Sequence, residues 1–356
     1  MDQVCIGSCT NSSFMDLMVV ANTVEGKKLD PNTISHLAPG SKQVFSMISE
    51  NGALSNLIES GFRIMESACG FCIGAGASPK TDAVSVRTNN RNFFGRSGTE
   101  SAGIYLVSPE TAGACALMGK ISNPKDLEIE YRRPSLPEKF YIDDSMIIEP
   151  TKDETIEIYR GPNISDPPEV QDFQDEISGV CSIKVGDKIT TDDISPAGFR
   201  LKYRSNIPKY SSFTFELIDE DFSDRCLENK EKGIANVIVG GDSYGQGSSR
   251  EHAALCPMYL GVKAVLAKSF ERIHYANLVN FGILPLLFEN EEDYGKIEQG
   301  DELLIKNATK IKGSKVLTLY NSTKDIKIPV RHNLSARQLE IILAGGTLNY
   351  MKKKIA

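Results

Sequence analysis

Short apolar runs followed by turns and amphipathic segments recur along the first part of the chain. Residues 4–6 form such a run, and beyond a turn the apolar residues of 14–21 recur at helical spacing, with Ser13 placed as an N-cap. Residues 104–107 form another run and lead into Ser-Pro-Glu at 108–110, a strong helix start. Such strand-turn-helix units predict a parallel α/β layer over residues 1–120.

The pattern changes between residues 121 and 174. Seven prolines punctuate a charged stretch there, and no long periodic segment survives between them. We interpret 121–174 as an interdomain linker. The alternative is a loop-rich flap packed on one domain, and a long linker that wraps a surface would be both.

Strand and helix patterns alternate again from residue 175 to residue 356, and the last part turns to β. We therefore expect a second α/β domain over 175–356. The expected strands are 235–239, 264–266, 283–287, 302–305 and 316–320, and the expected helices are 248–259, 270–281 and one that begins at Ser335.

Composition narrows the classes of protein. Hydrophobic residues are 40% and charged residues 24% of the chain, as in globular domains, and no apolar run approaches the roughly 18 residues that span a bilayer. The formal net charge of -7 and the absence of Trp disfavour nucleic-acid binding, which needs basic surface and stacking platforms. Eight cysteines are too sparse for a disulfide scaffold and no secretory signal is seen, so we expect a reducing cytoplasm.

Three cysteines lie in glycine- and serine-rich turns. Cys9 stands in Gly-Ser-Cys-Thr-Asn-Ser-Ser at 7–13, and Cys69 and Cys72 form a C-x-x-C within a glycine-rich stretch. A C-x-x-C alone fits a redox pair, half a zinc site or an iron–sulfur site. Three thiolates on a [4Fe–4S] cluster would leave one iron open as a Lewis acid.

Arginines concentrate shortly after the cysteine pair in this acidic chain. Arg87, Arg91 and Arg96 lie within ten residues, interleaved with asparagines. Arg91 and Arg96 can present planar forks to carboxylates, although a solvated surface loop is the simpler interpretation of such a run.

A glycine-rich stretch at 240–255 follows one expected strand and opens a helix. It is neither a dinucleotide fingerprint nor a phosphate-binding P-loop. Ser248, Ser249 and Arg250 at the helix start suit anion binding or an activated hydroxyl, and a pair of capping serines is the alternative. His252 is expected to pack or hydrogen bond rather than to bind a metal.

Several of these stretches together resemble the aconitase superfamily, and within it the aconitate hydratase branch. The resemblance covers nearly all of the chain outside the linker. The motifs are IGSCTNSS at 6–13, ACGFCIG at 68–74, NRNFFGR at 90–96, TTDDISPAG at 190–198, LKYR at 201–204, GQGSSREHAAL at 245–255 and KSFERIHYANLVNFGILPL at 268–286.

The resemblance implies a hydro-lyase of the tricarboxylic acid cycle that interconverts citrate and isocitrate through cis-aconitate. Its fold would be part of a three-layer α/β domain followed by a swivelling β/β/α domain. In the implied site, Cys9, Cys69 and Cys72 hold a [4Fe–4S] cluster, and Asn90, Arg91, Arg96, Arg204, Ser249 and Arg250 bind the tricarboxylate. The implied catalytic residues are Ser248, as the base, and Asp192 near it.

Two departures from the family pattern matter. Asp193 stands where aconitases usually have His, which favours the isopropylmalate isomerase branch slightly. The family also has domain-sized regions before the first cluster cysteine, and none of the four histidines lies in their motif. We therefore expect a C-terminal part that is inactive alone and is completed by an N-terminal region, in cis or in trans.

Three alternatives remain open. Isopropylmalate and homoaconitate isomerases are hydro-lyases of the same superfamily. A cluster-free form that binds RNA is another class of function, and the acidic charge weighs against it. A structural zinc site on the same cysteines is the third.

Overall fold

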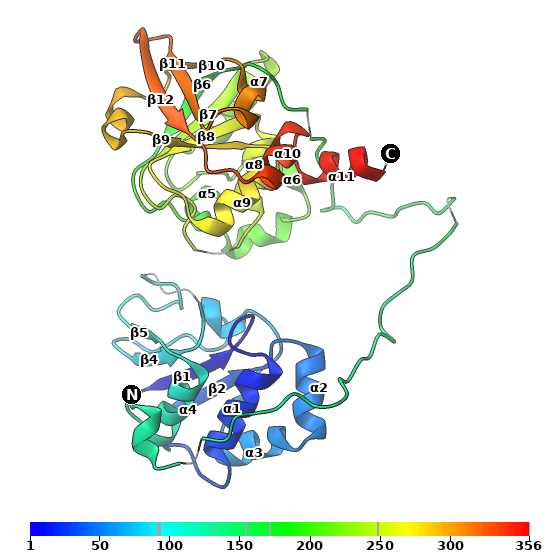
Figure 1. Cartoon of the computed structure of the whole chain (residues 1–356), viewed down its shortest axis with the longest axis vertical. Helices are drawn as coiled ribbons and strands as arrows, with labels where there is room; N and C mark the ends of the chain where they lie inside the picture. The colour runs from blue at the N-terminus through cyan, green and yellow to red at the C-terminus, as the bar shows by residue number, and fades with distance from the viewer. Residues whose placement is uncertain (91–93, 130, 154, 171, 248, 356) are drawn as a thin grey trace. The chain divides into compact units, whose positions relative to one another are not determined.

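The computed structural model describes residues 1–90, 94–129, 131–153, 155–170, 172–247 and 249–355, in two compact units (Figure 1). The units are Met1–Glu154 and Thr155–Ala356, so the predicted linker is divided between them. In the first unit, Lys42 Nζ lies 2.7 Å from Asp143. In the second, Ser165 N donates to Ser205 O at 2.9 Å.

The first unit has a five-stranded sheet in its described residues, with the order β3-β2-β1-β4-β5 and every pairing parallel. The predicted parallel α/β layer is therefore confirmed. Its elements are β1 Gln3–Gly7, α1 Phe14–Val24, β2 Ile34–Ala38, α2 Lys42–Glu50, α3 Ala53–Ser60, β3 Arg63–Ile64, the 3₁₀ helix η1 Gly70–Ile73, β4 Val84–Arg87, β5 Gly103–Leu106, α4 Pro109–Met118 and the 3₁₀ helix η2 Pro124–Leu127.

The two faces of this sheet are covered differently. Val4 and Ile6 of β1 pack into one core with α1–α4, whereas Cys5, on the other face, packs with Phe71 and Ala77. The alternation follows from the two-residue period of a strand. The helices therefore cover one face, and the loop that carries the C-x-x-C covers the other (Figure 1).

The predicted helix starts of this unit are confirmed. Ser13 caps α1 in a reciprocal capping box with Asp16. Ser108 caps α4, and Pro109 occupies its first turn. These side chains accept from backbone N–H groups that have no partner within the helix.

The second unit is built on a closed barrel with the strand order β10-β11-β12-β9-β8-β7-β6. Its elements are β6 Ile177–Lys184, α5 Thr191–Ile194, η3 Gly198–Tyr203, α6 Ile207–Ser211, α7 Phe222–Glu231, β7 Ala235–Gly240, α8 His252–Tyr259, β8 Val262–Ala267, α9 Arg272–Asn280, β9 Leu284–Phe288, η4 Glu291–Lys296, β10 Glu302–Ile305, η5 Ala308–Lys312, β11 Val316–Asn321, β12 Ile326–Arg331, α10 Ala336–Leu343 and α11 Thr347–Ile355.

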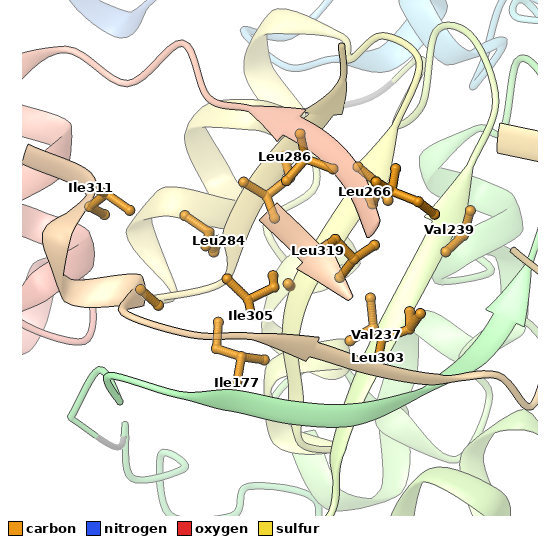
Figure 2. Packing of buried hydrophobic residues seen from close by; sticks show 14 of the residues in the cluster. Ile177, Val237, Val239, Leu266, Leu284, Leu286, Leu303, Ile305, Ile311 and Leu319 are labelled. Atoms are coloured by element: carbon orange, nitrogen blue, oxygen red, sulfur yellow. The ribbon is translucent and has the colours of Figure 1, made fainter. Parts of the chain in front are cut away.

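Branched apolar side chains from successive strands fill the barrel. Figure 2 shows Val237, Leu266, Leu286, Leu303 and Leu319 among the side chains that converge there from both the parallel and the antiparallel strands. Strands β6 to β9 pair in parallel and the remaining pairs are antiparallel. The predicted α/β class is therefore confirmed, and the sheet of its second unit is mixed.

One expected helix begins later than its sequence suggests. A helix was expected over 248–259, but α8 begins at His252. Gly245 and Gly247 have φ values of +85° and +102°, which place a non-helical loop before the expected start, and residues 249 and 250 have no regular secondary structure. No helix in the described part of the chain is both long and apolar enough to cross a bilayer.

Replacing Gly7 by Ala should destabilise the first unit strongly. Gly7 has a φ of +96°, and an added Cβ would lie 2.1 Å from the Ala38 carbonyl oxygen on the neighbouring strand. Gly26→Ala is the matched control, because its φ is +67° but nothing lies within 4 Å of the added atom. We expect a loss of about 1 kcal/mol for the control and at least about 2 kcal/mol more for Gly7→Ala, measured by urea unfolding followed by circular dichroism. Equal losses would contradict this packing.

Candidate functional site

The turn that carries Cys9 is tied to the end of β4. Gly7 N donates to Thr88 Oγ1 at 2.8 Å, and Asn11 Nδ2 donates to Thr88 O at 2.6 Å. Asn89 Nδ2 donates to Gly7 O at 3.2 Å. The turn is therefore fixed at the carboxyl end of the central strand, with Cys9 exposed.

The loop that carries the other two cysteines packs against the segment around Arg96. Cys72 is buried, and Arg96 Nη2 lies 3.5 Å from its Sγ. A Cβ on Gly74 would lie 2.4 Å from the Ser97 carbonyl oxygen, so the two backbones touch there. The structure thus brings together the predicted ligand Cys72 and the predicted substrate residue Arg96. Cys69 lies at the exposed start of η1.

The three cysteines of these loops have the chemistry of metal ligands, but their side chains are not placed together as a ligand set. Cys9, Cys69 and Cys72 are all free thiols. Buried Ser8 Oγ and Asn89 Oδ1, at the same edge of the sheet, have no hydrogen-bond partner within the described ranges. Such orphaned polar atoms are typical of a site that receives a further group. Even so, no three His, Cys, Asp or Glu side chains of the described residues are placed to hold a metal ion.

Two predicted residues of the arginine cluster follow β4. Asn90 is exposed directly after the buried Asn89. Arg91 lies outside the described residues, and so does Ser248, the predicted base.

In the second unit, Arg250 and Asp192 form an ion pair. Arg250 Nη1 lies 2.9 Å from Asp192 Oδ1, and it also donates to Ser195 O at 2.6 Å and to Thr191 O at 3.4 Å. The Arg250 side chain is 14% exposed and that of Asp192 is 45% exposed. Arg250 therefore secures the short helix α5, and the structure brings together two of the predicted site residues of this unit.

Asp193, the residue that departs from the usual aconitase pattern, has a structural role. Its Oδ2 accepts hydrogen bonds of 2.7 Å from both the backbone N–H and the hydroxyl of Thr190. Thr190 Oγ1 in turn accepts from Asp193 N at 3.0 Å. This reciprocal capping box begins α5. The identity of residue 193 therefore affects helix capping, and it is not a marker of substrate alone.

Arg204 and Ser249, two further predicted substrate residues of this unit, are both exposed. The Arg204 carbonyl oxygen lies 2.8 Å from His252 Nε2, and the His252 ring packs edge-on against Tyr210 at 5.2 Å. The prediction that His252 packs and hydrogen bonds is confirmed. It brings the end of η3 alongside the start of α8.

The loop before Ser248 rests on a histidine that the sequence pattern did not single out. A Cβ on Gly245 would lie 2.2 Å from His274 Cγ, and the Tyr244 ring lies 5.3 Å from the imidazole. Neither ring nitrogen has a partner in the part of the chain that is described. Burial lowers the pKa of His274 to about 4.

A cavity in the second unit lies away from all these residues. It is lined by Lys230, Ala235, Val262 and Gly345 among others, at the amino ends of β7 and β8. The predicted site residues of this unit instead follow the carboxyl ends of these strands, where parallel α/β sheets usually bind ligands. We therefore place the candidate site at the loops that follow these strands and not in the cavity.

Fold and loops together define an α/β protein with free thiols at a parallel-sheet edge and an arginine–aspartate pair beside a second, mixed sheet. Residues 1–119 match the Aconitase family (aconitate hydratase), and residues 187–291 match the Aconitase C-terminal domain. The chain belongs to the aconitase family.

Individual relatives agree with this assignment. The chain is 32% identical to a putative mitochondrial aconitate hydratase of Aspergillus fumigatus, over 98% of this chain and 50% of that protein. It is 30% identical to a mitochondrial homocitrate dehydratase of Saccharomyces cerevisiae, over 97% and 51%. A 3-isopropylmalate dehydratase structure from Methanocaldococcus jannaschii is 30% identical, with a TM-score of 0.38, over 51% of this chain and 95% of that one.

These comparisons fix the extent of the match and correct one prediction. The chain spans about half the length of the curated relatives that it matches. The prediction of a cytoplasmic location is wrong, because relatives from several organisms are named as mitochondrial proteins. Free cysteines indicate reducing conditions, and these do not identify a compartment.

Variants of the Arg250–Asp192 pair should separate the ion pair from the anchoring of α5. Asp192→Asn removes only a half-exposed charge, so we expect a loss of about 0.5 kcal/mol in the unfolding free energy of the second unit. Arg250→Met also removes the donors to two carbonyl oxygens, so we expect about 2 kcal/mol. Urea unfolding measures both values, and a larger loss for Asp192→Asn than for Arg250→Met would contradict this geometry.

His274 should make the stability of the second unit depend on pH. Its pKa is 6.5 in an unfolded chain and about 4 here, so between these values the unfolded state binds the extra proton. Stability is therefore lost as the pH falls from 6.5 to 4, by about 3 kcal/mol from this residue. His274→Gln should flatten the pH dependence of the unfolding free energy over that range. Parallel curves for the two proteins would refute the assignment.

Proposed function

We propose that this chain supplies the cluster-binding and substrate-binding loops of an aconitase-type hydro-lyase that interconverts citrate and isocitrate through cis-aconitate. The observation that carries the proposal is the end of β4. There, buried Thr88 and Asn89 hold the Cys9 turn, and the segment that follows places Arg96 beside Cys72. The segment from Thr88 to Arg96 thus contacts both the turn that carries Cys9 and the side chain of Cys72.

Cys9, Cys69 and Cys72 are the residues that would hold a [4Fe–4S] cluster. When bound, such a cluster supplies an open iron that acts as a Lewis acid toward a hydroxyl and a carboxylate. Cys9 and Cys69 are exposed and lie on loops, so a rearrangement of these loops would bring the ligand set together. Backbone N–H groups of the glycine-rich loop are suitable donors to the sulfur atoms.

The arginines would neutralise and orient the substrate. A tricarboxylate carries about three negative charges, and planar guanidinium groups bind carboxylates in a two-point geometry. Arg91, Arg96, Arg204 and Arg250 are assigned to this role, with Asn90 beside them. For Arg250, all three protein contacts described above use Nη1, and a guanidinium has five N–H donors in total.

Ser248 would remove the proton from carbon, with Ser249 and Arg250 next to it in sequence. A serine acts as a base only if its alkoxide is stabilised, and Arg250 is the adjacent cation. Asp192, paired with Arg250, would keep this guanidinium in place and so act as a positioning group. The names of the relatives support a mitochondrial location.

They also include a homocitrate dehydratase, so substrates should be tested both from the six-carbon citrate series and from the seven-carbon homocitrate series.

Anaerobic reconstitution with iron and sulfide tests the proposed cluster. The chain should gain the broad visible absorbance of an iron–sulfur cluster and bind iron and sulfide in equal amounts. Cys9→Ala, Cys69→Ala and Cys72→Ala should each lose it, whereas Cys115→Ala, a buried thiol of α4, should retain it. Zinc bound without visible absorbance, or a colour indifferent to all three changes, would refute the proposal.

Activity needs a separate assay, because the chain spans about half the length of its relatives. We expect no citrate–isocitrate interconversion by the reconstituted chain alone. Activity should appear when the polypeptide that corresponds to the remainder of the relatives is supplied, in cis or in trans. Turnover by the chain alone would show that its own loops are sufficient.

A further inference from the structure

Arg87 is a buried arginine on the face of the sheet that carries the cysteine loop. It is the last residue of β4, is 1% exposed and pairs with Cys5 of β1. Arginine is almost never fully buried unless its charge is satisfied. Its environment therefore needs an explanation that packing alone does not supply.

The guanidinium group binds both ends of the cysteine loop. Nη1 donates to the carbonyl oxygen of Phe71, the residue just before Cys72. Nη2 donates to the carbonyl oxygen of Ala77 at 3.1 Å. These two contacts attach the loop to the sheet at points six residues apart, on either side of the glycines that make it turn.

A small polar network fixes the guanidinium itself. Nε donates to Ser85 Oγ at 3.0 Å, and Nη2 donates to Gln3 Oε1 at 2.8 Å. Ser85 Oγ donates to the same Gln3 oxygen at 2.8 Å, and Gln3 Nε2 donates to Ala77 O at 3.2 Å. One side chain of β4 itself and one of the neighbouring strand β1 thus orient the guanidinium toward the loop.

All four acceptors of Arg87 are uncharged oxygens. Burial accordingly lowers the pKa of Arg87, and the nearby Cys5 and Cys72 sulfur atoms oppose this effect. A buried cation held by dipoles alone is unfavourable, and a negative group close to it would stabilise it. A cluster bound through Cys72 would be such a group.

We propose that Arg87 is the positioning residue of the Cys69–Cys72 loop and supplies a fixed positive charge beneath the metal site. This inference rests on the proposed cluster for its electrostatic part only, because the contacts to Phe71 and Ala77 stand without any metal. Arg87 is thereby separated from Arg91 and Arg96: it binds the protein and not the substrate.

The first test measures hydrogen–deuterium exchange without metal. Arg87→Met removes both charged donors to the loop, so exchange over residues 69–77 should rise about tenfold or more. Helices α2 and α3, on the other face of the sheet, serve as the internal control and should not change. Ser85→Ala is the matched variant, since it loses a contact to Arg87 but none to the loop.

The second test follows the reconstituted cluster by its visible spectrum and reduction potential. Arg87→Met should lower the yield of cluster and shift its potential to more negative values, because a buried positive charge is lost. Arg87→Lys should restore the potential in large part, since it keeps the charge, but not the slow exchange of the loop, since Arg87 binds the two carbonyls through two different nitrogens and lysine has only one. A merely structural role would not separate these two readouts.

The outcomes distinguish this inference from the proposed function. If the wild-type chain assembles no cluster, the proposed function fails, and the exchange experiment still decides whether Arg87 positions the loop. If the wild-type cluster forms and Arg87→Met changes neither exchange nor potential, the inference is overturned. If Arg87→Met does not fold, Arg87→Lys decides: faster exchange confined to the loop supports the inference, and unchanged exchange refutes it.

Discussion

The buried end of β4 is the constraint on which the candidate site depends. Arg87, Thr88 and Asn89 are 1%, 0% and 6% exposed, and each of them holds a segment that carries a cysteine. Arg87 faces the loop on one side of the sheet, whereas Thr88 and Asn89 reach the turn after β1. Because β4 lies between β1 and β5 in parallel register, three successive residues join elements that are far apart in sequence. Small changes in strand register would therefore move both segments at once.

The second unit solves a similar problem with a short helix and a glycine loop. The helix α5 is too short to be stable alone, and two side-chain devices hold it: the capping box of Asp193 and the three contacts of Arg250. The loop before Ser248 approaches His274 so closely that Gly245 has no room for a side chain. Here too, residues that are assigned no contact with substrate, Asp193 and His274, help to place the candidate site residues around them.

Sequence patterns recovered the elements that rest on local signals. The capped helices and the apolar strands β7, β8 and β9 fall close to their expected positions, because caps and continuous apolar runs are encoded locally. Strands β2 and β12 gave no such signal, since His36 and Pro329 interrupt their apolar pattern. The burial of Arg87 was equally invisible, because it arises from pairing with β1 and from a loop that returns to cover it. Spacing and local composition singled out the three cysteines and the arginine run, whereas their assignment to a cluster and to a tricarboxylate came from the family resemblance.

The arginines of this acidic chain differ in how many contacts each guanidinium makes within the protein. All the contacts of Arg87 go to the protein, and Arg250 directs one nitrogen to Asp192 and to backbone carbonyls. Arg204, by contrast, is exposed. A guanidinium that is already fixed loses little conformational entropy when it binds a carboxylate, whereas an exposed one must be ordered at that moment. Under the proposed function, Arg250 is therefore suited to fix the orientation of a carboxylate, whereas Arg204 would be ordered only when the carboxylate binds.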